Sequence, residues 1–255
     1  SFGEKRNNQN LNEIWQTLQE FKGLTKFELD LKDFKLLKEE YSSLGNMLAG
    51  FKELKELKLT FKKMAFHVER ELFTELKRGI DGQEKREKLE KLSLRFAIGN
   101  GEILPKGILF GRYKALKELE FEGGIQKGNI EELGQFIQEN GETLENLILK
   151  FRNTKKQLRT YQFKEENHLL DGKCLEELFG KIRGMRVLER LQLVLCEYKR
   201  NKRDGEPVCD LLEGCAKLRD AKVMLKIFSS YLNPILKLDF ARNIVTEAEV
   251  KKVMS

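Results

Sequence analysis

Cysteine and histidine are the side chains in this sequence best suited to metal binding or nucleophilic catalysis. The four cysteines all lie in the last third of the chain, at Cys174, Cys196, Cys209 and Cys215. No two of them form a C-x-x-C pair, so the ligand spacing of a zinc site is absent. His67 and His168 lie in no metal-binding or catalytic pattern, and we interpret His67 as a packing or surface residue. These residues predict neither a metal site nor a disulfide scaffold.

A glycine-rich run, EGGIQKGN at residues 122–129, lies between an expected strand and an expected helix, which is where phosphate-binding loops occur. It lacks the G-K-S/T ending that supplies a phosphate-binding lysine and a magnesium-binding hydroxyl. We therefore interpret it as a turn. No G-x-S-x-G or cysteine-nucleophile signature is present either. The sequence predicts a protein that is not an enzyme, with no cofactor and no small-molecule substrate.

The charge composition indicates a heavily solvated surface. Charged residues make up 35% of the 255 positions, and 48 basic and 41 acidic side chains leave a net charge of +7. This balance lacks the one-sided charge of a dedicated nucleic-acid binder. The sequence contains no apolar run of membrane-spanning length and no secretory h-region, so we expect no membrane contact and an intracellular, cytoplasmic location. The chain begins at Ser1, so a processed product and a piece of a longer polypeptide both remain open.

A repeated phrase, L-x-x-L-x-L, organises the chain. Its copies start at Leu24, Leu54, Leu89, Leu116, Leu144 and Leu188, with a weaker one at Leu218, so successive starts differ by 30, 35, 27, 28, 44 and 30 residues. Phenylalanine replaces one of the leucines in two copies. The period-two alternation predicts a strand with one buried face.

Segments with helical spacing precede most of these phrases. Residues 129–141 carry Ile130, Leu133, Phe136 and Ile137 on one stripe, and Gly141 provides a stop. Each unit is thus a helix, a tight turn and a strand. Because one unit cannot bury both its helix stripe and its strand face, several units must stack to form a continuous core.

The repeated phrase resembles that of the leucine-rich-repeat family, in particular its ribonuclease-inhibitor-like subclass. The resemblance implies an α/β solenoid of about seven irregular repeats with end caps, with a curved parallel sheet on the concave side and helices on the convex side. The usual Asn or Cys after the strand is missing, and Phe61, Phe96 and Phe151 extend the alternation instead. The alternative is an ordinary α/β domain, whose central strands would be buried on both faces. Polar residues between the leucines disfavour it.

Three regions are expected along the chain. Residues 1–22 form an N-terminal capping helix, in which one stripe carries Leu11, Ile14, Trp15, Leu18 and Phe21. Residues 23–225 form the repeat array, with basic insertions at 152–173 and 197–207. Residues 226–255 form a C-terminal cap, and the alternating run after Pro234 favours a hairpin-like end.

The resemblance places the residues between the leucines on the partner-facing concave side. The candidate partner-binding residues there are Lys58, Lys91, Arg95, Glu118, Glu120, Glu122, Ile148, Lys150, Arg190, Gln192 and Val194. A patchwork of charge with partly apolar positions suits a protein partner better than a uniform phosphate backbone.

The two insertions project from one edge of the expected array and are its most basic segments. Their candidate residues are Arg152, Lys155, Lys156, Arg159, Lys199, Arg200, Lys202 and Arg203. We expect a non-catalytic protein–protein interaction scaffold, a subunit or domain of a larger intracellular assembly, which binds through the concave face and these loops. The alternative is RNA or other polyanion binding through the insertions. A substrate-recruiting arm of a ubiquitin ligase is less favoured, because no adaptor-binding box is recognisable upstream.

Overall fold

The computed structural model of the chain describes residues 9–31, 38–62, 69–97, 111–124, 127–152, 172–198, 215, 217–227 and 235–241. These residues form an α/β fold around one eight-stranded sheet. The strands are β1 (Lys26–Leu31), β2 (Glu56–Lys62), β3 (Lys91–Ala97), β4 (Glu118–Gly124), β5 (Asn146–Arg152), β6 (Arg190–Tyr198), β7 (Asp220–Ile227) and β8 (Ile235–Ala241). The helices are α1 (Gln9–Gln19), α2 (Lys38–Gly50), α3 (Glu69–Ile80), α4 (Gln83–Lys88), α5 (Lys127–Glu139) and α6 (Gly172–Arg183).

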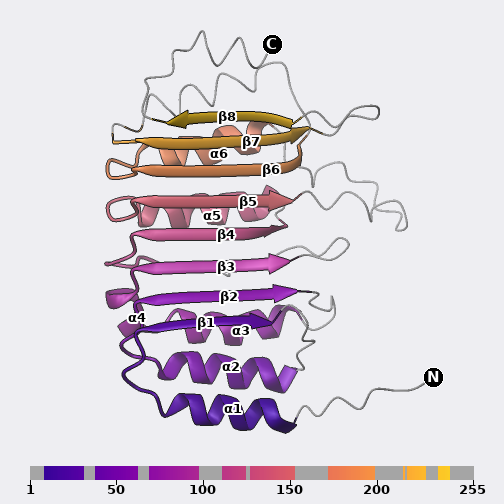
Figure 1. Cartoon of the computed structure of the whole chain (residues 1–255), viewed down its shortest axis with the longest axis vertical. Helices are drawn as coiled ribbons and strands as arrows, with labels where there is room; N and C mark the ends of the chain where they lie inside the picture. Colours follow the sequence, from indigo (N-terminus) through magenta and orange to yellow (C-terminus); the bar gives the residue numbers. More distant parts are fainter. Residues whose placement is uncertain are drawn as a thin grey trace, which may run out of the picture.

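The strands lie in the sheet in the order of the chain, from β1 to β8 (Figure 1). β1 to β7 pair in parallel, and β8 pairs antiparallel with β7. The register sets the repeated phrases side by side, so that Leu57 pairs with Leu92 and Leu59 with Leu94. The expected α/β class with a parallel sheet is confirmed, and the strands lie at the repeated phrases.

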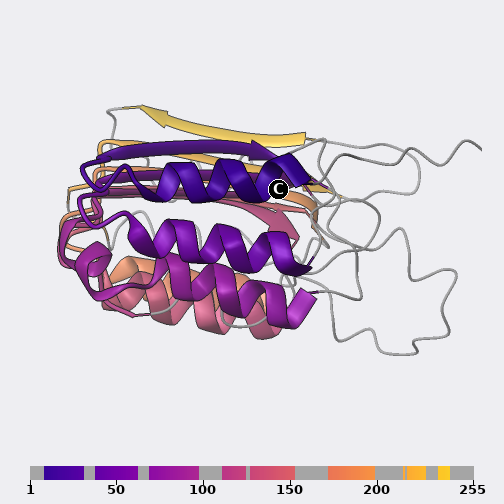
Figure 2. The ribbon, with the colours of Figure 1, turned by 90° about the horizontal axis from the view of Figure 1, so that it is seen from below.

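In the described part of the chain, helices cover one face of the sheet. α2, α3, α5 and α6 lie on the same side, and no helix of the described ranges covers the opposite side, which we call the open face (Figure 2). The strand leucines that face the helices, such as Leu59, Leu94 and Leu149, are fully buried. This one-sided cover distinguishes the fold from a parallel sheet buried on both faces.

The turn into each strand is held by a recurring pair of backbone hydrogen bonds. The Lys55 carbonyl accepts from the N–H groups of Glu90 and Lys91, at 2.8 and 2.9 Å. The same pair of hydrogen bonds recurs between neighbouring units at the carbonyls of Thr25, Lys55, Glu90, Lys117, Glu145 and Glu189. Since each bond joins one unit to the next, the ladder keeps all seven parallel strands in one register.

Aromatic rings replace aliphatic side chains along one line of the core, which we call the aromatic ladder. The Phe61 and Phe96 rings stack with centroids 5.5 Å apart. Phe121 lies 6.2 Å from both Phe96 and Phe151, and Tyr41 lies 6.3 Å from Phe61. Phe121, at a leucine position of the phrase on β4, therefore links the phenylalanines that extend the alternation, and the rings run from β2 to β5.

The N-terminal helix differs from its expected packing. Trp15 is buried at 2% exposure, as the stripe predicts, but Ile14 is 46% and Phe21 is 55% exposed. The stripe therefore packs against the core only in part. The physical reason is that α1 lies at the end of the array, where α2 is its packing partner among the described residues (Figure 1).

Parts of the expected caps and insertions lie outside the described residues. Residues 1–8, 153–171, 199–214 and 242–255 are among them. Arg152, assigned above to the first insertion, is the last residue of β5, and residues 197–198, assigned to the second, belong to β6. The antiparallel pairing of β8 with β7 agrees with a hairpin-like end.

Candidate binding surface

The strand register arranges the residues between the leucines in three parallel columns on the open face. The first column contains Lys26, Glu56, Lys91, Glu118, Asn146, Arg190 and Asp220. The second contains Glu28, Lys58, Ser93, Glu120, Ile148, Gln192 and Lys222. The third contains Asp30, Thr60, Arg95, Glu122, Lys150, Val194 and Met224. The structure thus brings all the predicted partner-binding residues onto one surface.

Opposite charges alternate along the first column at its β1 end. Lys26 pairs with Glu56 at 3.1 Å, and Lys91 with Glu118 at 3.7 Å. In the second column Lys58 donates a hydrogen bond to the Glu28 carboxylate, which lowers the pKa of Glu28. These pairs are largely exposed, so each contributes little to stability. The pairs bring opposite charges together within the open face.

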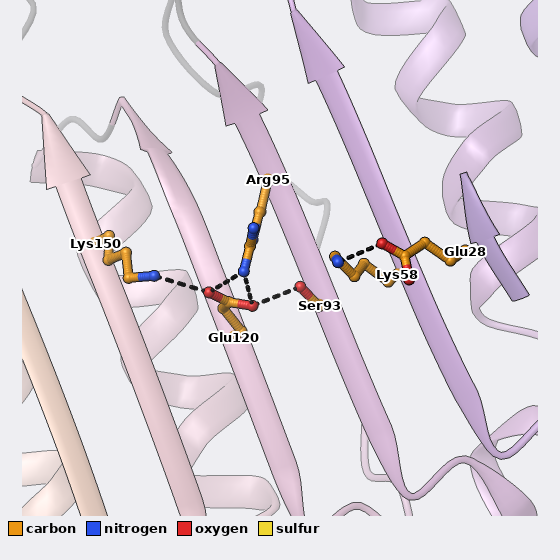
Figure 3. Close-up of polar contacts among 6 residues, drawn as sticks. All are labelled: Glu28, Lys58, Ser93, Arg95, Glu120 and Lys150. Atoms are coloured by element: carbon orange, nitrogen blue, oxygen red, sulfur yellow. Dashed lines mark hydrogen bonds and ion pairs between the residues drawn. The ribbon is translucent and has the colours of Figure 1, made fainter. Parts of the chain in front are cut away.

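Glu120 is the centre of the strongest polar network on the open face (Figure 3). Arg95 Nη2 lies 2.8 Å from both carboxylate oxygens, Ser93 Oγ donates to Oε2 at 2.8 Å, and Lys150 Nζ donates to Oε1 at 2.9 Å. The network joins β3, β4 and β5. Burial acts to raise the pKa of Glu120, but the hydrogen bonds from Arg95, Lys150 and Ser93 outweigh it and lower the pKa to about 2.

The network gives Glu120 a structural role beside its predicted one. This residue faces the open side, as predicted, but it is only 8% exposed and its two oxygens are occupied by neighbouring side chains. Glu120 therefore interacts with Arg95 and Lys150 within the surface, and its contact with a partner stays a prediction. Its hydrogen bonds also raise the pKa of Arg95. Glu120 positions Arg95 and Lys150 on the open face.

The open face becomes partly apolar over β5 to β7. Ile148, Val194 and Met224 are half-buried, and Val194 pairs with Met224 in the register. Ile148 lies on the neighbouring strand, beside Gln192. We call these three the apolar patch. Met224 was not among the predicted residues, although its position between Val223 and Leu225 in the weak seventh copy could have identified it.

Polar residues surround the apolar patch. Lys150 pairs with Val194 in the register, while Arg190, which is exposed, and Gln192 precede Val194 on β6. Lys222 lies beside Gln192 on β7. An apolar centre with a polar rim is the usual anatomy of a protein interface.

Most of the predicted basic-loop residues lie outside the described residues. They are Lys155, Lys156, Arg159, Lys199, Arg200, Lys202 and Arg203. Arg152 pairs with Cys196 in the register of β5 and β6. Because these strands are parallel and end side by side, the segments after Arg152 and Tyr198 start from the same edge of the sheet.

Within the described ranges, no three or more His, Cys, Asp and Glu side chains gather as a metal site. Cys215 is buried, which raises the pKa of its thiol to about 11 and makes the thiolate scarce at neutral pH. None of the described helices has the length and apolar character needed to cross a bilayer.

No family model and no curated protein sequence matches the chain.

Proposed function

We propose that the chain is an irregular leucine-rich-repeat solenoid of the ribonuclease-inhibitor-like kind, which serves as a non-catalytic scaffold for protein–protein interaction. Three features support the solenoid: the sequential strand order, the single register of the repeated phrases, and the helices on one face. The aromatic ladder takes the place of the polar side chains that follow the strand in that family.

The apolar patch is the observation that carries the functional proposal. Over β1 to β4 the outward columns hold no large apolar side chain, and several of their charges are paired across the strands. Over β5 to β7 the same columns carry Ile148, Val194 and Met224. These side chains lie on the open face, outside the core between the sheet and the helices. They contribute binding energy when a partner covers them.

The partner is a protein in a larger intracellular assembly, with an apolar anchor for the patch and acidic groups for Lys150 and Arg190. Binding is centred on the patch and extends over Lys58, Lys91 and Arg95 toward β2, and over the basic segments at the edge of the sheet. The charges of the open face alternate in sign, which suits a protein surface better than a polyanion. RNA binding through the basic segments is the competing hypothesis.

A single substitution in the patch tests the proposal. Tagged chains carrying Val194→Glu or Gln135→Glu, the latter at an exposed position on α5, are compared with wild type in native extract after nuclease treatment. We expect Val194→Glu to lower recovery of the co-purifying protein roughly tenfold, because a carboxylate would be desolvated at the interface, while Gln135→Glu leaves it unchanged. Equal recovery from all three chains, each with an unchanged melting temperature, would refute the assignment of the patch.

A further inference from the structure

The cations of the open face differ in whether a carboxylate pairs with them. On β1 to β3 every cation of the three columns has an acidic partner within the face, namely Lys26, Lys58, Lys91 and Arg95. On β5, Lys150 is held by Glu120 (Figure 3). Arg190 on β6 is exposed and Lys222 on β7 is half-buried, and neither forms an ion pair with another described side chain. These two cations beside the apolar patch can therefore receive carboxylates from outside.

The open face is also divided in its charge balance. The columns of β1 to β4 hold four bases and six acids, an excess of two acids. The columns of β5 to β7 hold three bases and one acid, an excess of two bases. β8 places Lys237 and Asp239 at the next register positions, which leaves that excess unchanged. The apolar patch therefore lies in the positively charged part of the open face.

One short segment can reach both the patch and the two cations. Ile148, Val194 and Met224 lie on three neighbouring strands, so they span about 10 Å across the sheet. Arg190 precedes Val194 by four residues on β6, about 13 Å along the strand. Lys222 precedes Met224 by two residues on β7. A segment that covers the patch thus has both cations within its reach.

The occupant must combine acids with apolar side chains, and the chain itself does not offer this combination. The patch of a second copy carries the same excess of bases, and the acidic columns over β1 to β4 hold no large apolar side chain. None of the ranges outside the described residues has a net negative charge, and the longest, 153–171, contains four bases and three acids. The columns of β5 to β7 hold no aromatic side chain on which a nucleic-acid base could stack. These observations favour an acidic segment of another protein.

We propose, as an extension that rests on the proposed function, that the apolar patch binds an acidic segment of the partner protein. Its apolar side chains cover Val194 and Met224, and its carboxylates pair with Arg190 and Lys222. Charged hydrogen bonds beside an apolar contact are shielded from water and select for acids. A segment without acids would leave the Arg190 guanidinium desolvated and unpaired, which lowers affinity.

Zero-length cross-linking tests the contact directly, because a carbodiimide joins a lysine amine only to a carboxylate that touches it. The tagged full chain and its bound protein are captured from nuclease-treated native extract, treated with carbodiimide, and digested for mass spectrometry. We expect a link from Lys222 to an Asp or Glu of the partner. Arg190→Lys keeps the charge and adds an amine, so this variant should show a second link to the same segment. The link between Lys150 and Glu120, whose atoms lie 2.9 Å apart, is the internal control.

Neutral variants measure how much the two cations contribute to binding. Arg190→Gln combined with Lys222→Gln should lower recovery of the cross-linked protein about fivefold, and Arg190→Lys should stay within about twofold of wild type. The matched control, Lys181→Gln combined with Arg183→Gln, removes two charges from exposed positions of α6 on the helix side of the sheet. It should leave recovery unchanged.

The outcomes separate this inference from the scaffold proposal. If Val194→Glu lowers recovery but positions 190 and 222 form no link to a partner carboxylate, the inference is overturned and the scaffold proposal stands. If Val194→Glu leaves recovery unchanged, the scaffold proposal itself fails. Links to acids of this chain would also overturn the inference, and mixing isotope-labelled with unlabelled chains shows whether one chain or two copies are joined. Binding that nuclease abolishes, with no protein link, would assign the surface to nucleic acid.

Discussion

Arg95 on β3 and Glu120 on β4 are joined by one nitrogen, the Arg95 Nη2 atom, which lies 2.8 Å from each oxygen of the Glu120 carboxylate. The two residues are diagonal neighbours on the open face, because Arg95 pairs with Glu122 in the register. Lys150 approaches the same carboxylate from β5. One buried acid therefore fixes two cations on a surface that we propose to bind a protein.

Replacing Glu120 should make stability less sensitive to acid. The folded-state pKa of Glu120, about 2, lies below its ordinary value of 4.5. The carboxylate therefore stabilises the fold above about pH 4.5, and this contribution is lost as the pH falls toward 2. We expect Glu120→Gln to lower the unfolding free energy at pH 7 by about 2 kcal/mol and the difference from wild type to shrink at pH 2.5. Urea denaturation of the variant and of the wild type at pH 7 and pH 2.5 measures this difference in unfolding free energy.

Glu118 on the same strand is the control for this effect. It is 34% exposed and has one ion pair, with Lys91 at 3.7 Å. Glu118→Gln should change stability by no more than about 0.5 kcal/mol. If Glu120→Gln lowers the unfolding free energy by the same amount at pH 7 and at pH 2.5, that result would contradict the account of the network.

Phe96 should be among the most costly positions to truncate, because it lies in the middle of the aromatic ladder. It is 4% exposed and contacts rings on both neighbouring strands. We expect Phe96→Ala to cost about 4 kcal/mol, and Phe96→Leu, which fills most of the volume, about 1.5 kcal/mol. Thermal and urea unfolding of both variants check this, and similar losses for the two would contradict the expectation that the filled volume accounts for most of the contribution of Phe96.

Two glycines on helices should respond in opposite directions to alanine. A Cβ at Gly79 on α3 would lie 2.4 Å from the Gly45 carbonyl oxygen of α2, so the two helices would have to separate. A Cβ at Gly180 on α6 has no heavy atom within 4 Å. Calorimetry should show Gly79→Ala destabilised by about 2 kcal/mol and Gly180→Ala stabilised by roughly 0.5 kcal/mol. A neutral Gly79→Ala would show that α2 and α3 do not approach this closely.

Asn140, at the end of α5, should be sensitive to loss of its amide. Its Oδ1 accepts from the Tyr113 N–H at 2.7 Å, and its Nδ2 donates to the carbonyls of Phe136 and Gly111 at 2.7 and 3.2 Å. The side chain is 1% exposed, so Asn140→Ala would leave backbone groups buried without partners. We expect a loss of about 3 kcal/mol in urea denaturation, against less than about 0.5 kcal/mol for Gln135→Ala on the surface of α5.

The sheet could be predicted from the sequence because the repeated phrase encodes both the strand and its buried face. A one-residue slip would expose Leu57 and Leu59 and bury Lys58, so the pattern determines the register as well. The three outward columns follow from the same alternation. Positions 26 and 56, 28 and 58, and 30 and 60 are paired in the structure as their places in the phrase require.

The interactions within the surface could not be predicted in the same way. The alternation identifies Glu120 as outward-facing, but its burial depends on the long side chains of Arg95 and Lys150, two residues from two other strands. The exposure of Ile14 and Phe21 depends on where the array ends, and the helical stripe alone does not contain that information. Asn140 bonds to residues 27 and 29 positions away and belongs to no sequence motif.

The most direct test of the scaffold is lysine cross-linking with mass spectrometry on the native protein in gently prepared extract, with and without nuclease. The account predicts nuclease-resistant cross-links from Lys58, Lys91 or Lys150 on the open face to one protein. Cross-links confined to Lys155, Lys156, Lys199 and Lys202 and lost after nuclease treatment would contradict it and favour nucleic-acid binding through the basic segments.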